Sequence, residues 1–181
     1  TCNEALLMQY LLKNTTDSKE RAVLINHFLE QFKGTLYRQT MFAEFELEIN
    51  ERAAKGESLT ASALCDIYRK LNEDYFGPDM EIDDNIALEW ARIPHFYYDY
   101  YVYQYATGFS AAIALSDKIL NEGEPAVRRY LNFLCSGCIK DPVSLLRDAG
   151  VDMSGPEPIE TALKLFNSLM DLSLIHISEP T

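Results

Sequence analysis

The sequence predicts an all-α fold, and three observations support this prediction. Apolar residues recur at three- and four-residue spacing along most of the chain, as they do on one face of a helix. No segment alternates apolar and polar residues over the length of a strand. Prolines fall where short helices would begin, a position that tolerates them: Pro125, Pro142, and Pro156 or Pro158.

The first 50 residues or so are predicted to hold two helices. The apolar spacing indicates a helix over residues 4–13, and a polar turn follows in which Thr16 or Asp17 can cap the next helix. This second helix is predicted to run to about Asn50. Gly34 lies inside it and marks a point where it bends or breaks, because glycine is a poor helix former.

The chain beyond this helix is predicted to be helical as well. Thr60 starts a helix that stops near Gly77-Pro78, and the acidic stretch after it is predicted to be a loop. Ile93-Pro94 indicates an extended or turn segment, since proline disfavours helix at the residue before it. A long aromatic helix is then predicted from about Tyr98 to Asn121.

Composition limits the classes of function. The chain has 181 residues and a net charge of −12, from 28 acidic and 16 basic residues, so we expect neither a nucleic-acid nor a membrane partner. No apolar run approaches the ~20 residues that span a bilayer, and no signal peptide is visible. Four cysteines are too few for a disulfide scaffold, which favours a reducing, cytoplasmic setting.

Residues 93–108 carry the densest chemical signal, with six of the eleven tyrosines and one of the three histidines. So many phenols can form an aromatic core helix with ordinary hydrogen bonds, or a wall whose hydroxyls face a hydrated cavity. On a helix these side chains would form two adjacent faces, with Tyr100, Tyr103 and Thr107 on one and Tyr98, Tyr101, Tyr105 and Phe109 on the other.

A functional interpretation of this segment centres on two residues. His95 lies on an irregular turn and Tyr103 lies on the helix predicted after it. An imidazole and a phenol can both donate hydrogen bonds to a carbonyl oxygen that becomes an oxyanion. The spacing alone does not decide between this role and packing.

Other candidate residues give weaker signals. Cys135 and Cys138 have the spacing of a redox or half-zinc motif, but no second pair exists, and two helix-end thiols explain them as well. His27 lies among apolar neighbours and is predicted to be structural. The glutamates at 44, 46 and 48 are predicted to be in part a solvated surface. His-Glu-x-x-His, a phosphate-binding loop and Gly-x-Ser-x-Gly are absent from the sequence.

Several strings of the sequence are informative when they are taken together. They are Asn3-Glu4-Ala5-Leu6-Leu7, Leu36-Tyr37-Arg38-Gln39-Thr40-Met41-Phe42-Ala43-Glu44-Phe45-Glu46, His95-Phe96-Tyr97, Tyr101-Val102-Tyr103-Gln104-Tyr105-Ala106-Thr107-Gly108, Ala149-Gly150-Val151-Asp152-Met153 and Pro156-Glu157-Pro158-Ile159-Glu160. Together they resemble the bacterial oligoendopeptidase F family, whose members are zinc metallopeptidases related to thimet oligopeptidase. The resemblance runs from Asn3 to about Asp171 in the family's order.

The resemblance implies the helical C-terminal part of a two-lobed catalytic domain that cleaves short peptides inside a channel. In that family the two histidines of His-Glu-x-x-His and a later glutamate hold Zn²⁺. The third ligand lies two helical turns before the glutamate that matches Glu4, so all the ligands would precede Thr1. We therefore expect no metal ligand in this chain. Glu4 would hydrogen-bond to a ligand, or would be a capping or surface residue.

The resemblance also implies roles for the tyrosine-rich segment. His95 and Tyr103 match the family's histidine and tyrosine that clamp the substrate backbone and the tetrahedral intermediate. A second tyrosine of the clamp comes from the turn between them, and Tyr97 and Tyr98 compete for that role. Tyr100 is a further substrate-binding candidate.

The last ten residues depart from the family. Residues 172–181 resemble the conceptual translation of a transposon-based sequencing adapter, so we assign only residues 1–171 to the peptidase. Two hypotheses follow for the function of the chain. The first is part of a zinc metalloendopeptidase, inactive by itself and dependent on the missing N-terminal part. The second is a non-catalytic helical binding or scaffold domain.

Overall fold

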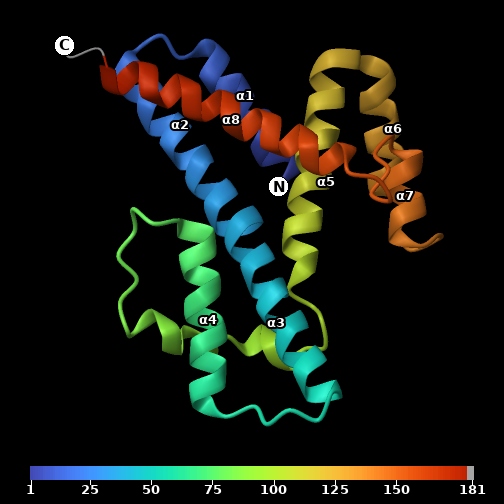
Figure 1. Ribbon diagram of the computed structural model, residues 1–181. Coiled ribbons are helices and arrows are strands. Elements are labelled where there is room, and N and C mark those ends of the chain that lie inside the picture. Colours follow the sequence, from blue (N-terminus) through green and yellow to red (C-terminus); the bar gives the residue numbers. More distant parts are fainter. Residues whose placement is uncertain (179–181) are drawn as a thin grey trace. The chain divides into compact units, whose positions relative to one another are not determined.

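The computed structural model describes residues 1–178, with side chains described through residue 173. Over this range the chain is helical and contains no strand, which confirms the all-α prediction (Figure 1). The α-helices are α1 (Cys2–Asn14), α2 (Ser18–Phe32), α3 (Arg38–Ala54), α4 (Ala61–Phe76), α5 (Tyr103–Glu122), α6 (Glu124–Cys135), α7 (Pro142–Asp148) and α8 (Glu157–Ser178), and the shorter elements are a π-helical turn (Lys33–Tyr37) and the 3₁₀ helices η2 (Ile86–Arg92) and η3 (Pro94–Tyr97).

The helices form two compact units. The first unit contains residues 1–33 and the chain from residue 107 onward, and the second contains residues 34–106. Every predicted catalytic or substrate-binding residue, from His95 to Tyr103, belongs to the second unit, whereas Glu4 belongs to the first.

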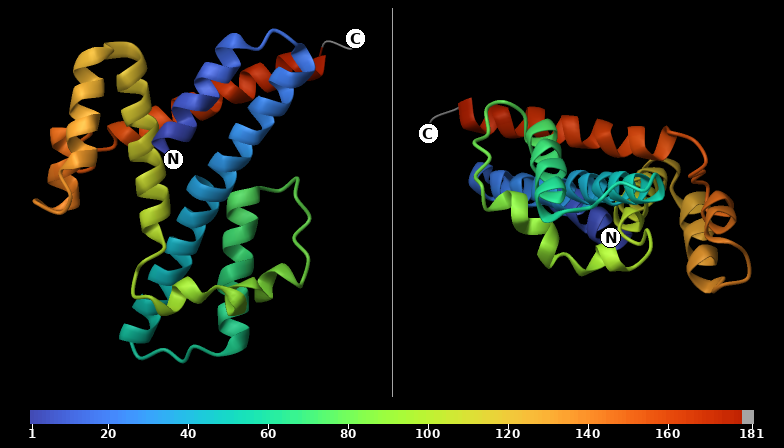
Figure 2. Two further views of the ribbon diagram at one scale, coloured as in Figure 1. Left: turned by 180° about the vertical axis from the view of Figure 1, so that it is seen from behind. Right: turned by 60° about the horizontal axis from the view of Figure 1, so that its bottom comes forward.

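The first unit is built on α2 and α8, which pack against each other, with α1 also against α2 (Figure 2). Phe32 is fully buried and its ring contacts those of Phe28, Phe109 and Phe166 at centroid distances of 5.4, 4.9 and 5.5 Å. Such aromatic burial is a main source of core stability. A second cluster gathers the small residues of α5, including Ala111 and Ala112, around Val151.

The second unit packs α3 against α4 and η2 against α4. Phe45 and Tyr68 are almost wholly buried at its centre, with ring centroids 5.3 Å apart and planes at 88°. Phe96, from η3, packs on Phe42 at 5.7 Å and on Phe45 at 4.9 Å. The residue next to His95 is therefore fixed in the core of this unit.

Local signals for helix starts agree with the structure. The Asp17 side chain accepts a hydrogen bond from the Glu20 N–H at 2.9 Å, and Thr60 accepts one from the Ala63 N–H at 3.2 Å. Both are N-caps, as predicted. The irregularity predicted at Gly34 is a π-helical turn, and the side-chain Nε2 of Gln39 donates a hydrogen bond to the Gly34 carbonyl at 3.1 Å.

Two further findings concern the chain as a whole. Among the described residues, none of the helices is both long and apolar enough to cross a bilayer. The backbone from Leu172 to Ser178 is part of α8, and residues 179–181 lie outside the described residues. The non-native origin of residues 172–181 stays a prediction.

Candidate functional site

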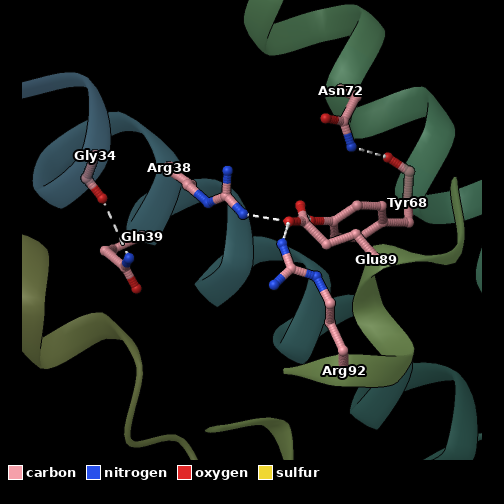
Figure 3. A network of polar contacts seen from close by, with 7 residues as sticks. All are labelled: Gly34, Arg38, Gln39, Tyr68, Asn72, Glu89 and Arg92. Carbon is pink, nitrogen blue, oxygen red and sulfur yellow. Dashed lines mark hydrogen bonds and ion pairs between the residues drawn. The ribbon is translucent and has the colours of Figure 1, made fainter. Parts of the chain in front are cut away.

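A buried carboxylate, Glu89, anchors the segment that leads to His95. Glu89 lies on η2, and its side chain is only 6% exposed. Arg38 from α3 and Arg92 from η2 both donate to its Oε1, and the Tyr68 hydroxyl donates to its Oε2 at 2.7 Å (Figure 3). These contacts tie η2 to both α3 and α4.

The electrostatics of this network favour an ionised glutamate and a neutral tyrosine. Burial opposes ionisation of Glu89, but the hydrogen bonds from Tyr68, Arg38 and Arg92 outweigh it, so the pKa of Glu89 is lowered. Burial first, and then the contact with Glu89, raise the pKa of Tyr68 well above its usual range. Tyr68 is therefore a hydrogen-bond donor to a charged acceptor, which is a strong type of bond.

His95 follows this anchor by six residues and lies in η3. Ile93 between the two 3₁₀ helices is extended (φ −90°, ψ 102°), which confirms the expectation for the residue before Pro94. The His95 ring is half-buried. Its position is set on one side by the Glu89 network and on the other by the packing of Phe96.

Three tyrosines surround His95, and we call these four residues the His95 cluster. The Tyr105 hydroxyl and His95 Nε2 are 3.0 Å apart and share a hydrogen bond, whose direction depends on the imidazole tautomer. The Tyr101 ring is nearly parallel to the imidazole at 6.0 Å, and the Tyr98 ring meets it edge-on at 5.9 Å. Burial, and then the neighbouring Tyr101, raise the pKa of Tyr105.

The backbone between Tyr98 and Tyr101 corrects the predicted helix start. Helix α5 begins at Tyr103, not at Tyr98, so the two helical faces predicted for this segment do not exist before Tyr103. Asp99 and Tyr100 both have left-handed backbone angles, with φ of 51° and 58°, which no α-helix allows. This turn is held by a contact from α3 that the local sequence does not reveal.

That contact comes from Glu46. Its Oε1 accepts a hydrogen bond from the Tyr100 N–H at 2.8 Å, and the residue is 1% exposed. The prediction that the glutamates at 44, 46 and 48 are in part a solvated surface agrees with the structure, since Glu44 is exposed and Glu46 is the buried member of the three. A carboxyl group this deeply buried needs a hydrogen-bond partner, and the backbone N–H is one.

The predicted substrate-binding residues lie on exposed parts of the second unit. Tyr97 is 77% exposed, Tyr98 57% and Tyr100 41%. Tyr103, the first residue of α5, is 50% exposed. Of these four tyrosines, Tyr98 contacts the His95 ring. Tyr101 and Tyr105 also contact it, although the sequence analysis did not propose them as site residues.

The other candidates lie away from this cluster in the sequence and carry no metal-ligand set. The Glu4 side chain, in the first turn of α1, is 65% exposed. Cys135 and Cys138 are exposed free thiols, and His27, predicted to be structural, is also exposed. Within the part of the chain that the structure describes, no three His, Cys, Asp or Glu side chains are grouped as a metal site requires.

Chemically, the His95 cluster is a set of hydrogen-bond donors and aromatic faces. Its phenols and imidazole can donate to peptide carbonyl oxygens, and its rings can pack on peptide side chains. The turn between Tyr98 and Tyr101 is held at its backbone by Glu46, and the Glu89 network ties η2, which precedes His95, to α3 and α4. This arrangement suits the binding of an extended polar ligand such as a peptide.

Comparison with known proteins agrees with this description. The model of Peptidase family M3 matches residues 1–165. The chain is 58% identical to Oligopeptidase PepF of Bacillus subtilis strain 168 over 171 residues, which cover 94% of this chain and 26% of that protein. It is 44% identical to the chromosomal oligoendopeptidase F of Lactococcus lactis subsp. cremoris, over 94% of this chain and 28% of that protein.

Solved structures give the same result. The crystal structure of oligoendopeptidase-F from Enterococcus faecium matches with a TM-score of 0.94 and 47% identity, over 97% of this chain and 34% of that one. The chain thus spans between a quarter and about a third of the length of these relatives. The resemblance noted in the sequence is confirmed, and the chain belongs to Peptidase family M3.

Proposed function

We propose that this chain supplies the substrate-binding and oxyanion-stabilising part of a zinc metalloendopeptidase that hydrolyses short peptides. The observation that carries the proposal is the His95 cluster, in which an imidazole with a phenolic partner at 3.0 Å lies on a turn lined by exposed tyrosines. Membership of a peptidase family makes a peptide the natural ligand for such donors.

In this proposal His95 and Tyr103 donate hydrogen bonds to the carbonyl oxygen of the scissile peptide as it gains negative charge. Tyr97, Tyr98 and Tyr100 contact the backbone and side chains of the peptide, with Tyr97 or Tyr98 as the second tyrosine of the clamp. Glu4 hydrogen-bonds to a metal ligand from outside the described chain. The parent enzyme works in the cytoplasm.

Zinc would be held by residues that precede this chain in the complete enzyme. The residues that the structure describes do not fit a metal, because they bring together no group of three ligating side chains. A zinc ion bound by the missing N-terminal part would polarise the substrate carbonyl and activate a water molecule. What this chain contributes is binding and hydrogen bonding.

A chimera tests the proposal. Residues 1–171 would replace the matching part of the Bacillus subtilis relative, which is 58% identical. Tyr103→Phe in this chimera should lower kcat by ~10²–10³, the usual loss when one oxyanion donor is removed. Tyr10→Phe, at a 64% exposed position on α1, is the matched control and should leave kcat unchanged. An unaffected kcat in Tyr103→Phe would make Tyr103 a packing residue only.

The chain by itself offers a second test. It should bind no stoichiometric zinc and hydrolyse no peptide, and zinc-dependent cleavage by this chain alone would refute the proposal. The alternative, a non-catalytic helical binding or scaffold domain, is distinguished by the upstream DNA. An intact His-Glu-x-x-His there makes an enzyme, and a degraded motif makes a scaffold.

A further inference from the structure

Glu46 is a buried acidic residue to which the proposed chemistry assigns no role. It lies on α3, where it is 1% exposed, among the apolar residues that form the core of the second unit. Its carboxyl oxygen reaches the backbone N–H of Tyr100, 54 residues further along the chain, at 2.8 Å. A buried carboxyl group is costly unless it is hydrogen-bonded, so its presence needs a specific reason.

The backbone that Glu46 holds is itself unfavourable. Asp99 and Tyr100 are consecutive residues with φ of 51° and 58°. Aspartate tolerates the left-handed region, but a bulky residue such as tyrosine rarely adopts it. Without an external partner, this pair would relax toward ordinary backbone angles, because strained residues persist only where the surroundings hold them.

The strained pair lies directly between two members of the His95 cluster. Tyr98 precedes it and Tyr101 follows it, and both rings contact the imidazole, at 5.9 and 6.0 Å. Their own rings are 6.3 Å apart and nearly perpendicular. A change in the turn would therefore rotate Tyr98 and Tyr101 away from their present places around His95.

We propose that Glu46 is a positioning residue, which pins the left-handed turn at Asp99–Tyr100 and thereby holds the tyrosines of the His95 cluster in place for the substrate. This inference rests on the proposed function of the cluster. In this proposal Glu46 acts through its hydrogen bond from the Tyr100 N–H at 2.8 Å, and we assign it no contact with the substrate.

The first test compares two substitutions in the chimera described above. Glu46→Gln keeps an oxygen acceptor of the same reach, and its kcat should stay within a few-fold of the parent. Glu46→Met keeps the length but loses the acceptor. Its kcat should fall by ~10–100-fold with little change in KM, because small misplacements of binding groups cost rate.

Two further variants separate positioning from stability. Asn72→Leu removes another buried hydrogen bond of the same unit, from the Asn72 amide to the Tyr68 carbonyl at 2.8 Å, and should leave kcat unchanged. Asp99→Gly lowers the cost of left-handed backbone angles at one of the two residues of the turn, so adding it to Glu46→Met should restore part of the lost kcat. A loss in Asn72→Leu equal to that in Glu46→Met, or no rescue by Asp99→Gly, would overturn the inference.

Hydrogen exchange gives a readout that does not depend on activity. In the unsubstituted enzyme the Tyr100 amide should exchange slowly although the residue is 41% exposed, and Glu46→Met should remove this protection. Fast exchange in the unsubstituted enzyme would overturn the inference without any variant.

If His95→Gln keeps full kcat, the proposed function fails. If His95→Gln loses kcat while Glu46→Met does not, only the positioning role of Glu46 fails.

Discussion

The Tyr68 hydroxyl donates a 2.7 Å hydrogen bond to Glu89, and both residues are buried in the second unit. The bond links α4 to η2, and Arg38 links the same carboxylate to α3. Three elements thus meet on one charged group. Because η2 leads directly to η3, the position of His95 depends on this buried network.

Tyr68→Phe should destabilise the second unit by about 1–3 kcal/mol, because it leaves a buried carboxylate short of one hydrogen bond. Trp90, the chain's one tryptophan, packs against the core of this unit and reports its unfolding in urea by fluorescence. Tyr10→Phe, at an exposed position of the first unit, serves as the control. An unchanged urea midpoint for Tyr68→Phe would contradict the importance of the network.

The second unit should lose stability in acid. The pKa of Glu89 in the folded chain lies below its ordinary value of 4.5, so the unfolded chain takes up a proton first as the pH falls. The contribution of Glu89 is therefore fully present above pH 4.5 and lost as the pH drops through the lowered pKa. The urea midpoint of unfolding, followed by Trp90 fluorescence, should therefore decrease as the pH is lowered from about 7 to about 3. Glu89→Gln should be less stable than the unsubstituted chain at about pH 7, and its urea midpoint should depend less steeply on pH. An equally steep dependence would show that Glu89 does not cause the loss of stability in acid.

Tyr105→Phe should lower kcat of the chimera by about 3–10-fold, the effect of losing one hydrogen bond of ordinary strength. The reason is that the Tyr105 hydroxyl is the partner of His95 Nε2, so its removal leaves the imidazole less well oriented. Tyr75→Phe is a matched control, since it removes a 2.9 Å hydrogen bond to Glu44 elsewhere in the same unit. Equal rates for the two variants would show that Tyr105 does not orient His95.

Gly150→Ala should destabilise the first unit by about 1–3 kcal/mol, because a left-handed backbone is strained for a residue with a Cβ atom. Gly150 has φ of +99°, and an added Cβ would lie 3.3 Å from Arg129 Nε. Gly155→Ala meets nothing within 4 Å and should cost much less. Thermal unfolding followed by circular dichroism compares the two variants, and similar melting temperatures would contradict a special requirement for glycine at position 150.

The helices could be predicted from the sequence because their signals are local. The caps at Asp17 and Thr60 lie within three residues of the N–H groups they accept from. The sequence also carries a local signal for the π-helical turn. Successive residues on the apolar face of this helix are four apart, except that Leu36 and Met41 are five apart.

The geometry of the site could be predicted only in part. The prediction that Tyr98, Tyr101 and Tyr105 share a helical face was wrong, because α5 begins only at Tyr103 and the three rings meet around His95 through an irregular turn. That turn depends on Glu46, which is distant in sequence, so no local pattern reveals it. For Glu89, the one available signal was a charged residue inside the apolar run from Ile86 to Trp90.

The Glu89 network also constrains how this sequence can drift over evolutionary time. Loss of Glu89 would leave the fully buried Tyr68 hydroxyl without its acceptor, so a change at 89 is tolerable only with a second change at 68. Arg92 is 73% exposed, and Arg38 still neutralises the carboxylate without it. Among descendants of this chain, positions 38, 68 and 89 should be inherited as a set, while position 92 varies alone.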